Sequence, residues 1–249
     1  MDHTNVIQRK EKVSVIIPAF NEERRLPATL GKIHRYFENK DYSYEVLVVD
    51  DGSTDNTAER IEDYIKMHNS TRLIRNGINK GKGYSVKNGF LQANGDYLLF
   101  SDADLSTPIE EIDKFSGYLR EGYDVAIGSR GLKESDIQVH QPWFREMMGK
   151  AFNILVRLLS LRGFKDTQCG FKCFTRKAAL EICKRQRMER FSFDVEMLYI
   201  AKKLGYKVKE VPVRWVNEPE TKVKAVRDSV NMFFDLLRIR LNDMTRKYE

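Results

Sequence analysis

The sequence predicts an α/β protein with a doubly wound, mainly parallel β-sheet and a C-terminal helical extension. Two observations lead to this fold class. Short apolar runs alternate with segments of about 12–16 residues whose apolar side chains recur at helical spacing, which is typical of β–α–β units. Four of the apolar runs also end in polar or acidic residues, as expected where the carboxyl ends of parallel strands form a ligand-binding edge.

Five strands are predicted in the first half of the chain, at residues 13–20, 44–50, 71–76, 96–104 and 123–130. Helical spacing predicts helices between them, at residues 21–40, 53–68, 82–93 and 108–121. The second helix starts in Ser, Thr and Asp, which cap helix N-termini, and the fourth begins at Pro108. The polar strand ends read PAFNE, VVDD, FSDAD and GSR, and we expect all four at one rim.

The pattern changes after residue 130. The sequence there predicts a long helix, a turn with a short strand, a second helix and a further strand, at residues 141–161, 165–174, 191–205 and 206–216. Apolar residues then recur at spacings of three and four along 221–246, among several lysines and arginines. We find no internal repeat or low-complexity linker. The predicted organisation is an α/β domain over residues 1–220 and an amphipathic helix over 221–249, packed on that domain or on a membrane surface.

The composition is that of a soluble globular protein, with 41% hydrophobic and 32% charged residues among 249. No apolar run approaches the ~18–20 residues of a membrane span, and the N-terminus has no apolar signal core. The 3 cysteines form an odd, sparse set, which argues against a disulfide scaffold and favours a reducing compartment. We therefore expect a cytoplasmic protein.

The net charge of +7 is unevenly distributed along the chain. Residues 130–190 hold 14 Lys and Arg against 6 Asp and Glu, and residues 222–249 hold 7 against 4. Acidic strand ends joined to a basic second half suggest a metal–phosphate site beside an anionic partner, with solvated charged faces as the alternative. Nucleic acid is not expected as a partner, because no aromatic–basic platform or known binding motif is present.

Asp102 and Asp104, in the sequence SDAD, are the candidate metal ligands. Alternate side chains of an extended segment point the same way, so both carboxylates can face one site. Such oxygen ligands suit Mg²⁺ or Mn²⁺, shared with substrate phosphates. The alternative is that these residues cap the helix that follows at STPIEE. The strand-end position and the second acidic tip at Asp50 and Asp51 favour the metal interpretation.

Other chemistries find less support in the sequence. Residues 79–85, NKGKGYS, form a basic glycine-rich turn whose Lys80 or Lys82 could approach a phosphate, although an ordinary loop explains it equally well. Its spacing does not match a phosphate-binding loop of the Walker type. The histidines fall in unrelated contexts, which argues against a Ser–His–Asp site. No G-x-G-x-x-G follows the first strand, which disfavours a dinucleotide-binding enzyme.

Several motifs resemble those of a known family. In order, SVIIPAFNEE, VVDDGSTDNT, NKGKGYSVKNGF, SDADLST and IGSR resemble the signature of family 2 glycosyltransferases with the GT-A, or nucleotide-diphospho-sugar transferase, fold. In the second half, DTQCGFKCFTR, ERFSFDVEMLYIA and RDSVNMFFDLLRIRL resemble the dolichyl-phosphate β-glucosyltransferase group, to which dolichyl-phosphate mannose synthases are close. Eukaryotic enzymes of this group carry an N-terminal membrane anchor that this sequence does not show, which leaves the polyprenol open.

The resemblance implies three sets of site residues within a glycosyltransferase domain. Nucleotide-sugar-binding residues would be Pro18, Phe20, Glu22, Asp51, Lys82, Asp102 and Ala103. Catalytic residues would be Asp102, Asp104, Arg130, Arg145 and Asp166, with Asp104 and Asp102 holding Mg²⁺ or Mn²⁺. Acceptor-side residues would be Arg130, Arg145, Gln168, Asp194 and Glu196. The two arginines would face the lipid phosphate or the departing diphosphate.

The implied activity is a metal-dependent, inverting transfer of a hexose, glucose from UDP-glucose first, to a polyprenyl or dolichyl phosphate. The enzyme would lie at the inner face of the membrane as a peripheral protein. Mannose from GDP-mannose, or a soluble or cell-surface glycan acceptor, are the alternatives. A sugar nucleotidyltransferase would show a glycine-rich Arg–Lys loop where PAFNEE stands, and a receiver-like binding module would be about half as long.

Overall fold

A computed structural model describes residues 10–40, 42–139, 163–218 and 225–249, with only the backbone of 225–230. It also describes the separate residues Met147, Gly149, Asn153, Ile154, Val156 and Leu161. Most of the helix predicted over 141–161, including Arg145, lies outside the described residues.

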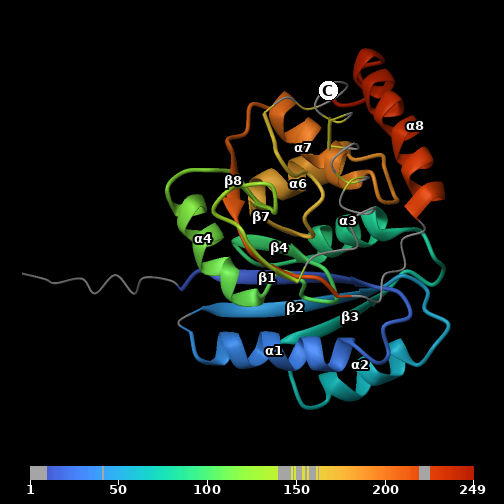
Figure 1. The fold of residues 1–249 in the computed structure, drawn as a ribbon. Coiled ribbons are helices and arrows are strands. Elements are labelled where there is room, and N and C mark those ends of the chain that lie inside the picture. Colours follow the sequence, from blue (N-terminus) through green and yellow to red (C-terminus); the bar gives the residue numbers. More distant parts are fainter. Residues whose placement is uncertain are drawn as a thin grey trace, which may run out of the picture.

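The described part of the chain forms a main sheet of seven strands in the order β3-β2-β1-β4-β7-β5-β8 (Figure 1). The strands are β1 (Lys12–Ala19), β2 (Ser43–Asp50), β3 (Thr71–Arg75), β4 (Tyr97–Ser101), β5 (Val125–Ser129), β7 (Phe171–Thr175) and β8 (Val208–Pro212). Neighbouring strands are parallel except where β7 pairs with β4 and β5. The predicted doubly wound, mainly parallel sheet is confirmed. Its strand order reverses between β1 and β4, which is where such sheets bind ligands.

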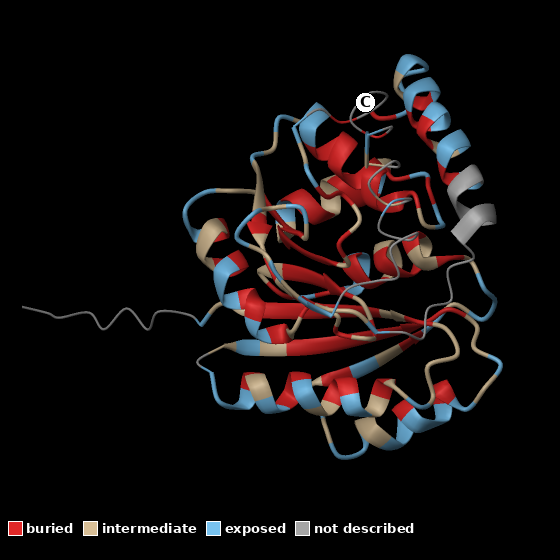
Figure 2. Ribbon diagram, in the orientation of Figure 1, coloured by how far each residue is buried: buried red, intermediate tan, exposed pale blue. Residues whose placement is uncertain are grey.

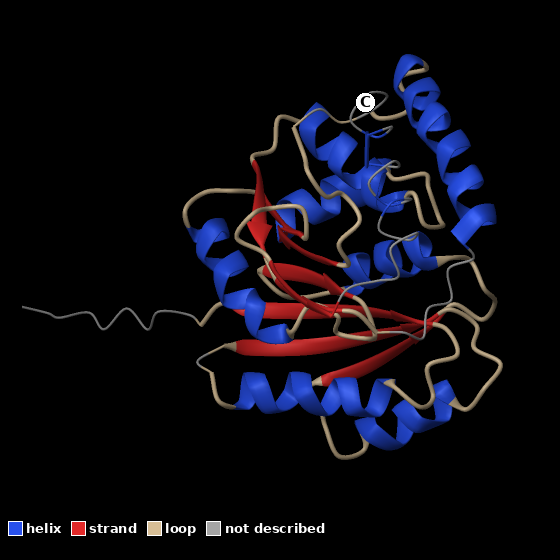
Figure 3. Cartoon of the chain, in the orientation of Figure 1, coloured by secondary structure: helices blue, strands red, loops and turns tan. Residues whose placement is uncertain are grey.

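Helices cover both faces of the sheet (Figure 3). One face packs against α1 (Leu26–Glu38), α2 (Thr57–Ile65) and α4 (Ile112–Arg120), and the other against α3 (Lys82–Gln92), α6 (Arg176–Arg185) and α7 (Phe193–Lys203). Successive strand residues point to opposite faces of the sheet. Val15 therefore packs in the hydrophobic cluster under α1, α2 and α4, and Ile16 packs in the cluster under α3, α6 and α7. Figure 2 shows the resulting buried layers on either side of the sheet.

The segment predicted as one strand over 206–216 forms two, and that prediction was wrong. β8 ends at Pro212, and β9 (Arg214–Val216) pairs with β6 (Asp136–Val139) in a separate two-stranded sheet. The sequence interpretation also missed β6 and α6. The signal for α6 was present, since the Thr175 side chain accepts a hydrogen bond from Ala178 N as an N-cap.

The last helix, α8 (Ala225–Met244), packs against α7. Met232, Leu236 and Ile239 join the same buried cluster as α6 and α7. Polar contacts add to this docking: the Tyr199 hydroxyl donates to Asp243 at 2.6 Å. One face of α8 therefore belongs to the core. Among the described residues, no helix is long and apolar enough to cross a bilayer.

Candidate active site

A cavity of about 390 Å³ lies at the carboxyl ends of β1 and β4, where the strand order reverses. Its walls come from the ends of β1, β4 and β5, the starts of α3 and α7, and the segment that precedes β7. Because β7 runs antiparallel, its starting residue Phe171 pairs with Ser101 at the end of β4. The sheet thus brings the sequences SDAD and DTQCG side by side.

Most of the predicted site residues line this cavity. They are Pro18, Phe20, Glu22, Asp51, Lys82, Asp102, Ala103, Asp104, Arg130, Gln168 and Asp194. Asp166 and Glu196 do not line it, and Arg145 lies outside the described residues. The structure therefore brings together residues that are as much as 176 positions apart, from Pro18 to Asp194.

Asp102 and Asp104 both face the cavity. Burial, followed by the negative charge of Asp102, raises the pKa of Asp104, as expected for two carboxylates that share a site. One oxygen of Asp104 accepts a hydrogen bond from Ser106 N at 2.9 Å, and the intervening Leu105 has a left-handed φ of 46°. A bulky residue in this conformation is strained, and such strain concentrates at functional sites. Two crowded carboxylates are a donor set that fits Mg²⁺ or Mn²⁺.

Two lysines accompany the acidic pair. Lys82, at the start of α3, has its ammonium 2.6 Å from Asp102 Oδ1. Burial opposes its charge, but the nearby Asp102 and Asp194 overcome this effect and raise the pKa of Lys82. Lys172 on β7 is fully buried, and its ammonium pairs with Asp194 and donates to the Cys169 carbonyl at 2.6 Å. Lys82, Asp102 and Asp194 thus line the cavity, and the buried Lys172 lies behind Asp194.

Arg130 is held against the cavity by Asp166. Its Nε and Nη2 donate to the two oxygens of Asp166 at 2.6 and 3.0 Å, and its guanidinium lies 5.5 Å from the Trp215 ring centre. Burial acts against ionisation of Asp166, but the charge and hydrogen bonds of Arg130 lower its pKa to about 2. Asp166 therefore positions Arg130. Asp166 does not line the cavity, so its direct part in catalysis stays a prediction.

Asp51 holds the loop that enters α3. Its carboxylate accepts hydrogen bonds from the Asn76 side chain at 2.8 Å and from the backbone N–H groups of Lys80 and Gly81 at 3.0 and 2.8 Å. The next residue, Gly52, has a φ of 72°, and a Cβ there would lie 2.6 Å from the Ile78 carbonyl carbon. Asp51 lines the cavity, so its contact with a nucleoside stays a prediction alongside this structural role.

Glu196 does not line the cavity, so its predicted acceptor-side role stays a prediction without a contact in the cavity. It is fully buried on α7, accepts hydrogen bonds from Arg187 N and Met188 N at 2.9 and 2.7 Å, and accepts one from the Tyr248 hydroxyl at 2.6 Å. The helical repeat explains why Asp194 lines the cavity and Glu196 does not. Asp194 and Glu196 are two positions apart, which places them on different sides of a helix.

The sequence interpretation missed several further residues of this site, of which five bear on its chemistry. Arg190, Phe191, Trp215 and Met232 line the cavity, and Lys172 lies behind it. For Lys172 a signal existed, because a lysine in the middle of the apolar strand FKCF needs a buried partner. The other four come from the loop before α7, from β9 and from α8, and only tertiary packing brings them to the rim.

Gly170 offers a test of this geometry. A Cβ at this position would lie 2.0 Å from Asp102 Oδ2, while Asp102 N donates to the Gly170 carbonyl at 3.0 Å. We expect Gly170→Ala to push the Asp102 carboxylate aside and to reduce turnover about 10²-fold, since misplacing a reacting group by about 1 Å has that effect. Steady-state kinetics and thermal unfolding measure the two effects.

Gly117→Ala is the matched control, because a Cβ there meets nothing within 4 Å and α4 gains helix propensity. It should unfold at the same or a higher temperature with unchanged turnover. Normal turnover in Gly170→Ala would contradict the close approach of Gly170 to Asp102.

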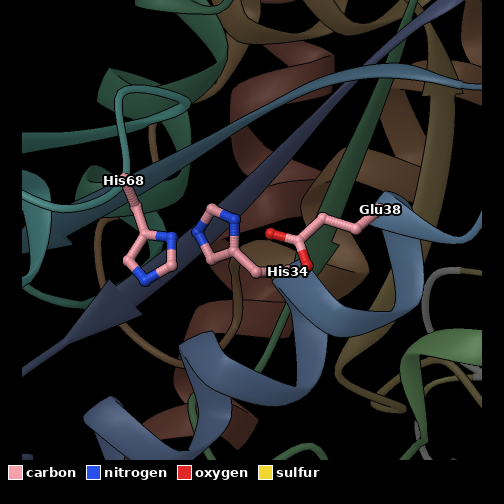
Figure 4. Close-up of side chains that lie close together, drawn as sticks. All are labelled: His34, Glu38 and His68. Atoms are coloured by element: carbon pink, nitrogen blue, oxygen red, sulfur yellow. The ribbon is translucent and has the colours of Figure 1, made fainter.

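A second group of potential metal ligands, His34, Glu38 and His68, lies beside the starts of β2 and β3 (Figure 4). Both ring nitrogens of His34 have hydrogen-bond partners, Tyr44 Oη at 2.8 Å and Thr71 Oγ1 at 2.7 Å. The two imidazoles are stacked with centres 4.6 Å apart, so their in-plane nitrogens do not converge on one point. Burial, followed by the charge of His68, lowers the pKa of His34. This group is a hydrogen-bonded aromatic stack.

Residues 14–181 match the sequence profile of the family described as Glycosyl transferase family 2. The chain is 38% identical over 240 residues to a dolichyl-phosphate beta-glucosyltransferase of Dictyostelium discoideum, a match that covers 92% of this chain and 73% of the relative. It is 34% identical over 248 residues to a dolichyl-phosphate beta-glucosyltransferase of Homo sapiens, covering 94% of this chain and 76% of the relative. The expected resemblance to this group is confirmed.

Solved structures of lower identity share the fold. Mannosyl-3-phosphoglycerate synthase from Rubrobacter xylanophilus superposes with a TM-score of 0.69 at 18% identity, covering 95% of this chain and 75% of that one. Glucosyl-3-phosphoglycerate synthase from Mycobacterium tuberculosis, in complex with Mn²⁺, UDP-glucose and phosphoglyceric acid, gives 0.63 at 16% identity, covering 93% and 79%. With the expected GT-A fold confirmed and the family profile matched over most of its length, the chain belongs to glycosyl transferase family 2.

Proposed function

We propose that this protein transfers glucose from UDP-glucose to dolichyl phosphate or a related polyprenyl phosphate, with inversion at the anomeric carbon. The observation that carries the proposal is one cavity that unites the Asp102–Asp104 pair with the cations Lys82 and Arg130. This set suits a metal, a diphosphate and a phosphate acceptor. The relatives named for this reaction align with more than nine-tenths of the chain, which supports the same substrates here.

The chemistry needs little beyond positioning and charge. A phosphate oxygen of the acceptor attacks the anomeric carbon as the bond to the diphosphate breaks, so an α-linked donor gives a β-linked product. A phosphomonoester has a second pKa of about 6, so the acceptor is a nucleophile at neutral pH without a strong base. Negative charge grows on the departing diphosphate, and Lys82 and Arg130 are two of the cationic side chains of the cavity that would stabilise it.

A divalent ion bound by Asp104 and Asp102 would supply further positive charge at the leaving group. Arg130 matches a phosphate group in two-pronged geometry, and Asp166 together with Trp215 fixes its orientation. Asp51 keeps the 76–81 loop in place, so that Lys82 enters the cavity from a defined direction. The remaining cavity residues shape the pocket for the nucleoside and the sugar.

The acceptor proposal includes a membrane surface. An outer stripe on α8, made of Phe234, Leu237, Leu241 and Met244, is 61%, 44%, 57% and 78% exposed. The exposed Arg238, Arg246 and Lys247 lie on the same helix or just beyond it. Met232, on the inner face of α8, lines the cavity, so the helix that carries the stripe borders the site. A prenyl chain leaving the cavity would meet this apolar surface.

We expect the intact protein to float with vesicles that contain anionic phospholipid, and high salt to release much of it. The double substitution Phe234→Ser/Leu241→Ser should reduce the bound fraction at least about tenfold, because each apolar side chain placed in lipid contributes about 1.5–3 kcal/mol. Both side chains are mainly exposed, so folding and UDP binding should be retained.

Met67→Ser is the matched control, since Met67 is 75% exposed next to α2, on the other side of the sheet (Figure 1). It should float like the unmodified protein. An intact protein that stays unbound at low salt, even with polyprenyl phosphate in the vesicles, would argue for a soluble acceptor.

Incubation with UDP-glucose, UDP-galactose, GDP-mannose and dolichyl phosphate, followed by mass analysis of the lipid, tests the proposed reaction. Glucosyl phosphodolichol formed from UDP-glucose is the expected product. A mannosylated lipid made from GDP-mannose would show that the donor is GDP-mannose and not UDP-glucose. The absence of any glycosylated lipid would reject dolichyl phosphate as the acceptor.

A further inference from the structure

Lys82 sits where it competes for one of the two acidic groups of the site. Its ammonium lies 2.6 Å from Asp102 Oδ1, and the two side chains are only 27% and 31% exposed. The ammonium also lies 5.2 Å from the centre of the Phe100 ring, which forms an apolar floor beneath it. A divalent ion bound to Asp102 would therefore approach a carboxylate that already has a cation.

Asp194, the neighbouring carboxylate, cannot easily become the ion-pair partner of Lys82 in place of Asp102. Asp194 is already paired with Lys172, which is fully buried and can leave only by unpairing a buried charge. Lys172 and Asp194 thus pair directly, and Asp102 is the carboxylate that pairs directly with Lys82. When Asp102 also binds a divalent ion, it stabilises the charge of Lys82 less, so the partly buried ammonium needs a second anion beside it.

We propose that Lys82 is an exchangeable counter-ion, which neutralises Asp102 while the donor is absent and pairs with the donor diphosphate when a divalent ion joins the two aspartates. This inference rests on the metal and nucleotide diphosphate of the proposed function, and is independent of the sugar and the lipid. No covalent bond changes in this exchange. Lys82 begins α3, so a short movement of its flexible side chain suffices while the helix stays in place.

The exchange couples the binding of metal and nucleotide. A divalent ion alone must displace Lys82 from Asp102, which weakens its binding. With UDP present, the displaced lysine gains a new partner, so UDP strengthens metal binding and the metal strengthens UDP binding by the same factor. Lys82 should therefore lower the affinity for the ion alone and raise the coupling factor.

The test measures the affinity of the protein for Mn²⁺ with and without UDP. The electron paramagnetic resonance signal of free Mn²⁺ reports the fraction that is not bound. Lys82→Met keeps the length and the apolar contact with Phe100 but removes the charge. We expect Lys82→Met to bind Mn²⁺ alone at least about tenfold more tightly than the unmodified protein, the range for losing a hydrogen-bonded competitor of a charged group. The strengthening of Mn²⁺ binding by UDP should shrink at least about tenfold. A residue that only supports the fold would not improve metal binding when removed.

Lys82→Arg keeps the charge and should retain weak binding of Mn²⁺ alone. Lys80→Met is the matched control from the same loop, because Lys80 Nζ donates to the Tyr84 hydroxyl at 3.1 Å and makes no ion pair with Asp102. It should behave like the unmodified protein. Lys82→Gln repeats the test if thermal unfolding shows that Lys82→Met folds poorly.

Unchanged or weaker binding of Mn²⁺ alone by Lys82→Met or Lys82→Gln, with normal coupling in the unmodified protein, would overturn this inference and leave the proposed function standing. An unmodified protein that shows no coupling between Mn²⁺ and either UDP or GDP would overturn both.

Discussion

Replacing Asp104 by asparagine should reduce metal-dependent transfer at least about 10²–10³-fold, because a metal at a leaving diphosphate contributes several kcal/mol to the transition state. The fold should not suffer. Asparagine can still accept the hydrogen bond from Ser106 N, and it removes a charge that burial and Asp102 disfavour. We therefore expect an unchanged or higher unfolding temperature together with lost turnover. Transfer assays at several Mg²⁺ and Mn²⁺ concentrations, with thermal unfolding, measure both.

This combination separates a functional carboxylate from a capping one. If Asp104 only closed the turn before the 3₁₀ segment Ile109–Glu111, asparagine would serve equally and turnover would stay near normal. Asp63→Asn is the matched control, since the Asp63 side chain is 74% exposed and pairs with Lys66 on the surface. It should change turnover little, and near-normal transfer by Asp104→Asn would exclude Asp104 as a metal ligand.

The first half of the fold could be predicted from the sequence because its signals are local. Strands β1 to β5 are apolar runs with polar ends, and parallel pairing places those ends at one edge whatever the details of packing. Asp102, Asp104 and Asp51 follow directly from that rule, whereas Lys82 entered the predicted site through the resemblance to the family. The start of α1 was predicted five residues too early, at residue 21, because the helix begins at Leu26 with a proline in its first turn.

The second half depended on contacts that have no local signal. The partnership of Arg130 with Asp166 joins residues 36 apart, and that of Lys172 with Asp194 joins a strand to a helix. The resemblance to the family predicted Arg130, Asp166 and Asp194 as site residues. It also predicted Glu196, whose carboxylate accepts hydrogen bonds from the backbone N–H groups of residues 187 and 188. Sequence spacing alone could not distinguish a residue in the cavity from one that supports it.

Arg130 should be as important for turnover as Asp104, and its removal needs a design that keeps the protein folded. Arg130→Met would leave Asp166, which is 3% exposed, as an unpaired buried charge, at a cost of about 3–5 kcal/mol in the free energy of unfolding. A loss of activity in this variant would then have two explanations. The double substitution Arg130→Met/Asp166→Asn removes both charges and should recover most of that stability.

We expect the double variant to remain about 10²–10³-fold less active, the usual effect of losing one donor to a charge that develops in the transition state. Its stability should also respond differently to acid. The pKa of Asp166 falls from its ordinary value near 4 to about 2 in the folded protein, so the pair stabilises fully above about pH 4 and this contribution is lost as the pH falls toward 2. The double variant should lack this decline. Chemical unfolding between pH 2 and 7 measures the difference.

Arg120→Met is the matched control for Arg130, because Arg120 pairs with Glu11 on the surface, where both side chains are more than one-third exposed. Such a pair contributes about 0–1 kcal/mol, so this variant should keep both stability and turnover. The decisive comparison is the stable double variant with dolichyl phosphate and UDP-glucose. If it transfers glucose at the normal rate, Arg130 serves only to neutralise Asp166 at the end of β5, and the phosphate of the acceptor or the leaving group must be held by other residues of the rim.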